Sequence, residues 1–197
     1  MWRGPALLLV LASCAAAEHE QAAAVAAEVV ESFEVQPYVV SGSTITQLRT
    51  ALRALRPAAS DGARFDAITR WEIKYRYQFD PDAIGGCGTA GAQVHLEMHM
   101  EFPTLAGDVP PQTRIALESY LTALRVHEDG HVKIDREIAA AVVEAVRATP
   151  AQPSCERLRE AVRAATGRVM EEGHARNREY DAMTRHGATQ GAVFPRP

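Results

Sequence analysis

Two histidines four residues apart, with an acidic residue beside the first, are the strongest chemical signal in this sequence. They stand in the segment His127-Glu128-Asp129-Gly130-His131. In an α-helix, residues four apart lie about 40° apart around the axis and one turn along it, so both imidazoles could bind one metal ion. Glu128 would lie beside that ion and could accept a proton from water. The pattern is typical of zinc-dependent peptidases, with His127 and His131 as ligands and Glu128 as general base.

Gly130 is unusual inside a helical pattern, because a glycine in a helix interior costs about 1 kcal/mol relative to alanine. Its place between Glu128 and His131 predicts the close approach of a substrate or of a neighbouring segment. The alternative is a surface helix that carries two histidines and an acid-glycine step by chance.

A catalytic zinc ion needs a third protein ligand, and the C-terminal part of the chain offers two candidates. We favour His186, which precedes Gly187, where a helix would end and leave the imidazole free to reach a cleft. Asp181 is the alternative, either as the ligand or as an acceptor that orients a ligating imidazole. Tyr180 could donate a hydrogen bond to a developing oxyanion, although a helical tyrosine is more often packed. We expect His174 to be exposed.

The elements that must position these residues change character near residue 110. Before it, alternation of apolar and polar residues predicts two half-buried strands, at 71–79 and 94–102, which a glycine-rich loop joins as an antiparallel pair. A further strand at 35–40 and a helix at 47–56 precede them. The N-terminal half should therefore form a small antiparallel or mixed sheet.

From Pro111 onward, apolar residues at helical spacing predict two long helices, separated near Pro150 and Pro153. The first helix carries the histidine motif, and the fold class is α+β. Opposite charges three or four residues apart predict an ion-paired, solvated face on the second helix. The expected pairs are Glu156 with Arg159, Glu160 with Arg163, and Glu172 with Arg176.

His95 and His99 share one face of a predicted strand with Glu97 and Glu101. We interpret this face as polar and solvated rather than as a second metal site. If this strand lay at the edge of the sheet, an extended peptide substrate could add to it near the metal.

Residues 1–17 resemble a bacterial export signal, with one positive charge followed by a short apolar run. That run is too short to span a bilayer, which takes roughly 20 apolar residues. We favour a lipobox that ends at Cys14, which would attach the protein to a membrane, over ordinary cleavage after Ala15-Ala16-Ala17. Residues 18–28 would form a tether, and 29–197 a single domain.

Processing or lipidation accounts for Cys14 and leaves Cys87 and Cys155 in a compartment that oxidises thiols. We therefore expect a disulfide between them. The alternative is a pair of buried, unbonded cysteines. A zinc site is not indicated, because neither cysteine has the spacing to other Cys or His residues that such a site requires.

The overall composition is that of one ordinary globular domain. The chain has 197 residues, of which 47% are hydrophobic, and a formal net charge of −4. This mildly acidic balance lacks the positive patch that binds a polyphosphate backbone. Nucleic acid is therefore excluded as the default partner.

Segments along the chain resemble the bacterial family called domain of unknown function 922, which is described as secreted zinc-dependent proteases of the zincin kind. The matching segments are Tyr38-Val39-Val40-Ser41-Gly42, Trp71-Glu72-Ile73-Lys74-Tyr75, Cys87, His127-Glu128-Asp129-Gly130-His131, Tyr180-Asp181 and Thr184-Arg185-His186-Gly187. The resemblance implies a zincin-like α+β fold with a metal site between two helices. It implies no substrate, because the protease description follows largely from the metal motif. One departure is Tyr120, where we would expect a tryptophan in relatives.

Three functions are compatible with these features. We favour a secreted or envelope-anchored zinc metallopeptidase, in which His127, His131 and His186 hold Zn²⁺ and Glu128 activates water. Its substrate would be a peptide or protein of the cell envelope. The alternatives are a zinc-binding envelope protein without turnover and a lipoprotein that binds a partner through its helices. An intact Glu128 argues against the former, because a structural zinc ion needs no base.

Overall fold

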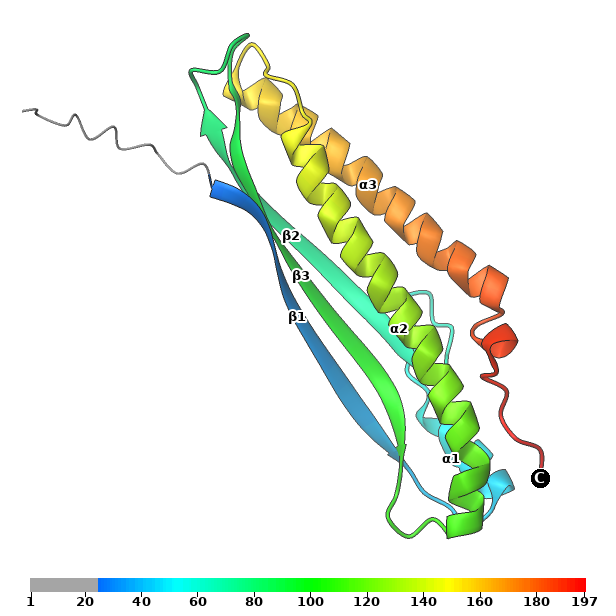
Figure 1. Cartoon of the computed structure of the whole chain (residues 1–197). Helices are drawn as coiled ribbons and strands as arrows, with labels where there is room; N and C mark the ends of the chain where they lie inside the picture. Colours follow the sequence, from blue (N-terminus) through cyan, green and yellow to red (C-terminus); the bar gives the residue numbers. More distant parts are fainter. Residues whose placement is uncertain (1–24) are drawn as a thin grey trace, which may run out of the picture.

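The computed structural model has two layers, a three-stranded sheet and a pair of long helices that cover one face of it (Figure 1). The elements are β1 (Val25–Val40), α1 (Ile45–Leu55), β2 (Ile68–Asp80), β3 (Gly88–Leu105), α2 (Pro111–Arg147), α3 (Cys155–Thr184) and the 3-10 helix η1 (Ala188–Gln190). The structure describes residues 25–197, with side chains from residue 29 onward. The expected signal segment, 1–17, and Cys14 lie outside the described residues. The predicted α+β fold, a mixed sheet followed by two long helices, is confirmed.

The sheet has the strand order β1-β3-β2, so β3 is central. It pairs antiparallel with β2, as predicted, and parallel with β1. β1 is longer than the sequence pattern indicated, since it begins at Val25 instead of residue 35. The last four residues of the expected tether, 25–28, are thus strand residues. Pairing with β3 along its length, such as Val29 with Val94 and Phe33 with Met98, extends β1 beyond its own apolar run.

The core lies between β3 and α2. β3 buries one alternating set of side chains completely, and α2 covers them with a stripe at helical spacing. The strand residues are Val94, Leu96, Met98 and Met100, and the helix residues are Val132, Ala139, Val142 and Val143. Each such large aliphatic side chain contributes about 1.5–3 kcal/mol through burial. This contact fixes the position of α2 on the sheet.

The opposite face of the sheet is polar. Ion pairs join Arg70 to Glu101 and Lys74 to Glu97, and His99 lies 3.5 Å from Glu34. The interpretation of this histidine-bearing face as solvated agrees with these contacts. The strand itself is central, so the edge strands of the described sheet are β1 and β2 and not β3.

α3 lies beside α2 (Figure 1) and packs closely against it at Gly173, where an added Cβ would lie 2.5 Å from Ile138 Cδ1. Ser154 caps α3 by accepting a hydrogen bond from the Arg157 backbone N–H at 3.3 Å. The three ion pairs predicted for α3 are wrong for the described residues. Arg157 pairs with Glu160 within α3, while Arg176 crosses to Glu137 of α2. Contacts with neighbouring elements decide where these arginines point.

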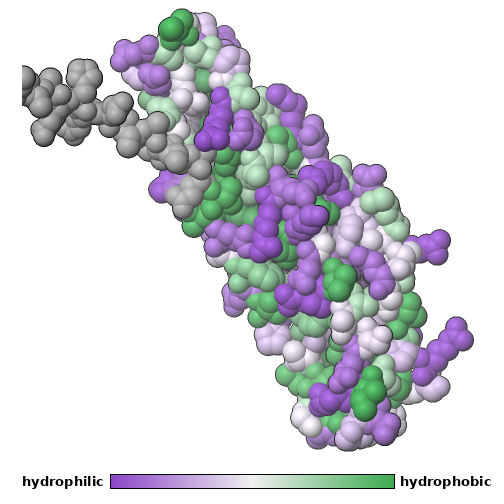
Figure 2. Space-filling model, viewed as in Figure 1, coloured by the Kyte–Doolittle hydropathy of each residue, from purple (hydrophilic) through white to green (hydrophobic). Residues whose placement is uncertain are grey.

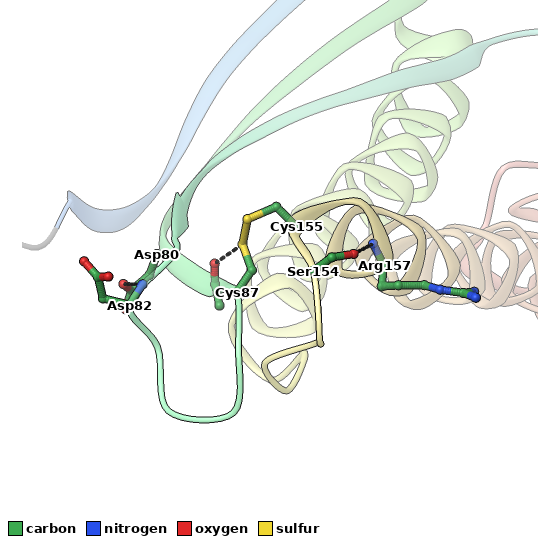
Figure 3. Close-up of a disulfide and its surroundings, with 7 residues drawn as sticks. Asp80, Asp82, Cys87, Ser154, Cys155 and Arg157 are labelled. Carbon is green, nitrogen blue, oxygen red and sulfur yellow. Dashed lines mark hydrogen bonds between the residues drawn. A yellow bond between two sulfur atoms is a disulfide. The ribbon is translucent and has the colours of Figure 1, made fainter.

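The predicted disulfide is confirmed. Cys87 and Cys155 are bonded, with their Cα atoms 5.0 Å apart (Figure 3). The backbone of Cys87 also exchanges hydrogen bonds of 2.8 and 2.9 Å with Gln152. A side chain at Gly86 would overlap the Gln152 carbonyl oxygen, so a glycine is required there. These contacts tie the turn between β2 and β3 to the first turn of α3.

The surface in view is mixed in polarity. Figure 2 shows hydrophilic side chains interspersed with hydrophobic patches along the length of the molecule. Among residues 25–197, no helix combines the length and the apolar character that crossing a membrane requires.

Candidate metal centre

His127 and His131 of α2 and Asp181 of α3 converge where the two helices face each other. The Nε2 atoms of His127 and His131 lie 3.2 and 3.1 Å from Asp181 Oδ1. With metal–ligand bonds of about 2.0–2.1 Å, two ligands of a tetrahedral zinc ion lie about 3.3 Å apart. One ligand atom from each residue falls within a group no wider than 4.8 Å. The three side chains can therefore hold one metal ion.

A hydrogen bond on its far nitrogen fixes the orientation of the His127 ring. Its Nδ1 lies 3.1 Å from Gln190 Oε1, which accepts the Nδ1 proton and leaves Nε2 free as a ligand. η1 carries Gln190 and lies close to α2 because Gly187, at φ 81°, has no side chain. An added Cβ there would lie 3.0 Å from His127 Cβ.

A longer chain of hydrogen bonds orients His131. Its Nδ1 lies 2.7 Å from Asn177 Oδ1, and Asn177 Nδ2 donates to Asp135 Oδ1 at 2.9 Å. Because the amide NH₂ serves Asp135, the amide oxygen must accept, and His131 carries its proton on Nδ1. Asp135 is only 1% exposed, and burial raises the pKa of its carboxyl to about 6, against the opposing effect of the Asn177 hydrogen bond.

The charged groups of the centre shift one another's pKa values. Burial would raise the pKa of Asp181, but in the metal-free centre, where the imidazoles can be protonated on both nitrogens, hydrogen bonds from His127 and His131 hold it well below its usual range. Burial would likewise lower the pKa of His131, yet hydrogen bonds to Asp181 and Asn177 and the negative charge of Glu128 raise it. Asp181 is therefore an ionised carboxylate, as a metal ligand must be.

Glu128 is buried beside the two imidazoles and faces the same cleft. Its Oε2 accepts a hydrogen bond of 2.8 Å from Thr69 Oγ1 at the start of β2. Burial raises the pKa of Glu128, and the Thr69 hydrogen bond opposes that shift. A carboxylate that is held in place and has a raised pKa suits a general base.

The cleft has a volume of about 710 Å³ and separates two walls. The segment 56–71 forms one wall, and α2 with α3 forms the other. The Asp66 carboxylate anchors the first wall, because it pairs with Arg56 and accepts a hydrogen bond from the Tyr120 hydroxyl. The hydroxyl of Tyr120 thus helps to hold this wall of the cleft in place.

His186 lies at the rim of the centre. Its side chain is 57% exposed, and its Nδ1 approaches Asp181 Oδ1 at 3.3 Å. The compact group of ligand atoms contains Asp181, the alternative third ligand, instead of His186. α3 ends at Thr184, and left-handed backbone at Arg185 and His186 turns the chain away.

Tyr180 lies behind the imidazoles. Its ring stacks on His127 with centroids 5.1 Å apart and meets His131 edge-on at 5.0 Å. Its hydroxyl donates to the His127 carbonyl oxygen at 3.3 Å and accepts from Gln190 at 3.0 Å. Gly130 makes room for this ring, as the expected close approach of a neighbouring segment requires. The geometry is that of a packed tyrosine, the alternative to an oxyanion donor in the sequence analysis.

His174 is exposed, as expected, and its ring stacks on Trp71 at the cleft, with centroids 4.6 Å apart. Sequence reasoning missed the partners Thr69, Asp135, Asn177 and Gln190. Helical spacing could have revealed two of them, since Asp135 follows His131 by four residues and Asn177 precedes Asp181 by four.

The family model for "Bacterial protein of unknown function (DUF922)" matches residues 35–187. The chain belongs to this family. The matched range includes both histidines, Glu128 and Asp181, whereas Gln190 lies beyond it. The predicted membership is confirmed, and the family's description names no activity. No curated protein and no solved structure matches the chain.

Proposed function

We propose that the protein is a zinc-dependent peptidase of the bacterial cell envelope, with His127, His131 and Asp181 as its zinc ligands. The observation that carries the proposal is the convergence of both Nε2 atoms on Asp181 Oδ1, at 3.2 and 3.1 Å, in the cleft that Glu128 also faces. Asp181 takes the role of third ligand for which the sequence favoured His186.

The donor set fits zinc. Two imidazole nitrogens and one carboxylate oxygen form a common catalytic ligand set for this ion, and both imidazoles have hydrogen-bond partners that hold them. The carboxylates of Glu128 and Asp181 also place negative charge where a dication would neutralise it. When bound, zinc would supply a Lewis acid that lowers the pKa of water and polarises a carbonyl group.

The protein's own residues have distinct roles in hydrolysis. Glu128 accepts the proton of the attacking water and later delivers it to the leaving amine. Thr69 holds the Glu128 carboxylate by its 2.8 Å hydrogen bond. Tyr180 stacks on His127 and keeps its imidazole in place, which makes it a positioning residue.

The position of β2 favours a peptide substrate. In the described sheet β2 pairs only with β3, so its second edge is free to pair with an extended chain. Thr69 and Trp71 of this strand line the cleft beside Glu128. A peptide added to β2 would therefore pass the base with its backbone extended.

The disulfide favours export, because such bonds persist in oxidising compartments. Together with the signal predicted at 1–17, it supports a periplasmic or secreted protein, with membrane attachment through a lipidated Cys14. The expected substrate is a peptide or protein of the cell envelope.

Zinc analysis and peptide hydrolysis test the proposal together. We expect one zinc ion per chain in the purified protein and cleavage of peptides that stops on addition of a chelator. Glu128→Gln should keep the zinc and abolish cleavage, whereas Asp181→Ala should lose the zinc. His186→Ala should retain most of both.

Two results would contradict the proposal. Failure of the folded protein to bind zinc after reconstitution would refute the metal centre. Bound zinc with no hydrolysis dependent on Glu128 would favour the non-catalytic zinc-binding protein. If His186→Ala loses zinc and Asp181→Ala keeps it, the ligand assignment is wrong and the enzyme proposal stands.

A further inference from the structure

A second pocket, of about 340 Å³, lies between the far end of β2 and the first half of α3. We call it the arginine pocket. Its lining residues are Tyr75, Arg76, Tyr77, Phe79, Arg159 and Arg163. Three aromatic residues and the α3 arginines Arg159 and Arg163 line it, and no acidic residue does, while the guanidinium of Arg76 bonds to Gln93 on the other face of the sheet.

The guanidinium groups of Arg159 and Arg163 have no carboxylate partner among the described residues. Arg159 and Arg163 are the residues for which helical spacing predicted pairs with Glu156 and Glu160. Glu160 instead pairs with Arg157, at 3.3 Å. The Arg159 guanidinium lies 5.4 Å from the centre of the Phe79 ring. The pocket thus presents two guanidinium groups without an ion-pair partner among the described residues, beside aromatic side chains.

The arginine pocket and the metal cleft lie along one seam between β2 and α3. The metal cleft is lined by Thr69 and Trp71 of β2 and by Asp181 of α3. The arginine pocket is lined by Tyr77 of β2 and by Arg163 of α3. Eight strand residues from Thr69 to Tyr77 span about 26 Å. Eighteen helix residues from Arg163 to Asp181 span about 27 Å. The two sites are therefore one extended octapeptide length apart along the free edge of β2.

We propose that the arginine pocket binds an acidic side chain of the polypeptide substrate, about eight residues from the bond that is cleaved. The inference rests on the proposed peptidase function and names the substrate class, an extended chain with a distal Asp or Glu. Carboxylates pair with guanidinium groups through two parallel hydrogen bonds, and the methylene groups of a glutamate pack on aromatic rings.

Antiparallel addition to β2 sets the direction of the substrate. β2 runs from the cleft toward the pocket, so an antiparallel chain has its N-terminal part at the pocket. The acidic residue then precedes the cleaved bond. Parallel addition would place it after the bond.

Binding to the Glu128→Gln protein tests the pocket without turnover. The probe is a fluorescein-labelled hexaglutamate peptide, with labelled hexaglutamine as its neutral counterpart, followed by fluorescence anisotropy at low salt. Arg159→Gln combined with Arg163→Gln should weaken hexaglutamate binding on the order of tenfold, as expected for the loss of two exposed ion pairs. The matched control combines Arg53→Gln with Arg168→Gln, two exposed arginines outside the pocket, and should change binding little. Equal binding by the two double variants would overturn the proposal.

Cleavage-site profiling with a mixture of long proteome-derived peptides tests the spacing. For the wild type we expect enrichment of Asp and Glu seven to nine residues from the cleaved bond, and loss of this enrichment in the Arg159→Gln/Arg163→Gln protein. Cleavage without such enrichment would refute the exosite and leave the peptidase proposal intact. Absence of any Glu128-dependent cleavage would refute the peptidase proposal. The substrate-binding role of the arginine pocket would then be refuted too, even if the pocket binds hexaglutamate.

Discussion

Replacing Gly130 by alanine tests how the two helices assemble the metal centre. A Cβ added at Gly130 would overlap the hydroxyl and Cζ of Tyr180 and lie 2.9 Å from Cε1. Carbon atoms pack at about 3.5–4.0 Å, so the tyrosine ring must move by on the order of 1 Å. The ring stacks on His127 and precedes Asp181 in the chain. The movement therefore disturbs two proposed ligands.

Two opposing effects set the size of the change. Overpacking of a close contact costs typically about 1–3 kcal/mol. The greater helix propensity of alanine returns about 1 kcal/mol. The overlap here is with a ring that is held on both sides, so we expect the Gly130→Ala protein to lose about 1–2 kcal/mol of unfolding free energy. Displaced ligand partners typically weaken metal binding about 10–100-fold, and we expect that loss as well.

Gly167 provides the matched control, because it lies inside α3 with no atom within 4 Å of an added Cβ. Gly167→Ala should therefore gain about 1 kcal/mol from helix propensity alone. Urea unfolding of both variants in chelator gives the stability of the metal-free protein, and competition with a zinc-binding dye gives the zinc affinity. The Gly130→Ala protein could instead be stabilised as much as Gly167→Ala and bind zinc as tightly as the wild type. That result would show that Tyr180 does not pack against α2 at Gly130.

The folded-state pKa of Asp135, about 6, lies above its ordinary value of 3.8, so ionisation of this buried carboxyl destabilises the folded protein as the pH rises through this range. In chelator, Asp135→Asn should gain about 2.5 kcal/mol more stability at pH 8 than at pH 4, and equal effects in urea titrations at both pH values would contradict the burial of this charge. Replacing Cys87 and Cys155 by serine should cost about 4 kcal/mol of unfolding free energy without changing zinc stoichiometry, and loss of zinc from the folded variant would show that the bond also supports the distant site. Thr69→Val should lower kcat/KM about tenfold by removing a hydrogen bond to a charged group, with zinc content unchanged; full activity would mean that Glu128 needs no such partner.

The features that could be predicted from the sequence depend on local periodicity. Alternation identified β2 and β3, and helical spacing identified α2 with its histidine motif. Ser154 marked the start of α3, where its side chain caps the helix. The pairing of Cys87 with Cys155 followed from the oxidising compartment that the signal segment implied.

The features that could not be predicted depend on which element lies beside which. The length of β1 follows from its pairing with β3, far away in the sequence. The proposed third ligand depends on where α3 stops, since Asp181 lies within the last helical turn and faces α2, whereas His186 lies in the left-handed backbone after the helix. Arg159 and Arg163 had suitable helical partners, yet they line a pocket beside β2 instead. Local spacing predicts which contacts are possible, and packing selects among them.

The strand order has a consequence for the sequence of events in folding. β1 and β2 pair only with β3 in the described sheet, and β3 begins at Gly88. A nascent chain that ends before Gly88 therefore holds two long strands with no partner between them. The pairing of β1 with β3 joins residues about 65 positions apart, such as Val30 and His95, and distant pairings of this kind slow folding. The sheet of the described residues therefore cannot assemble until β3 has been made, whatever the state of the two strands that precede it.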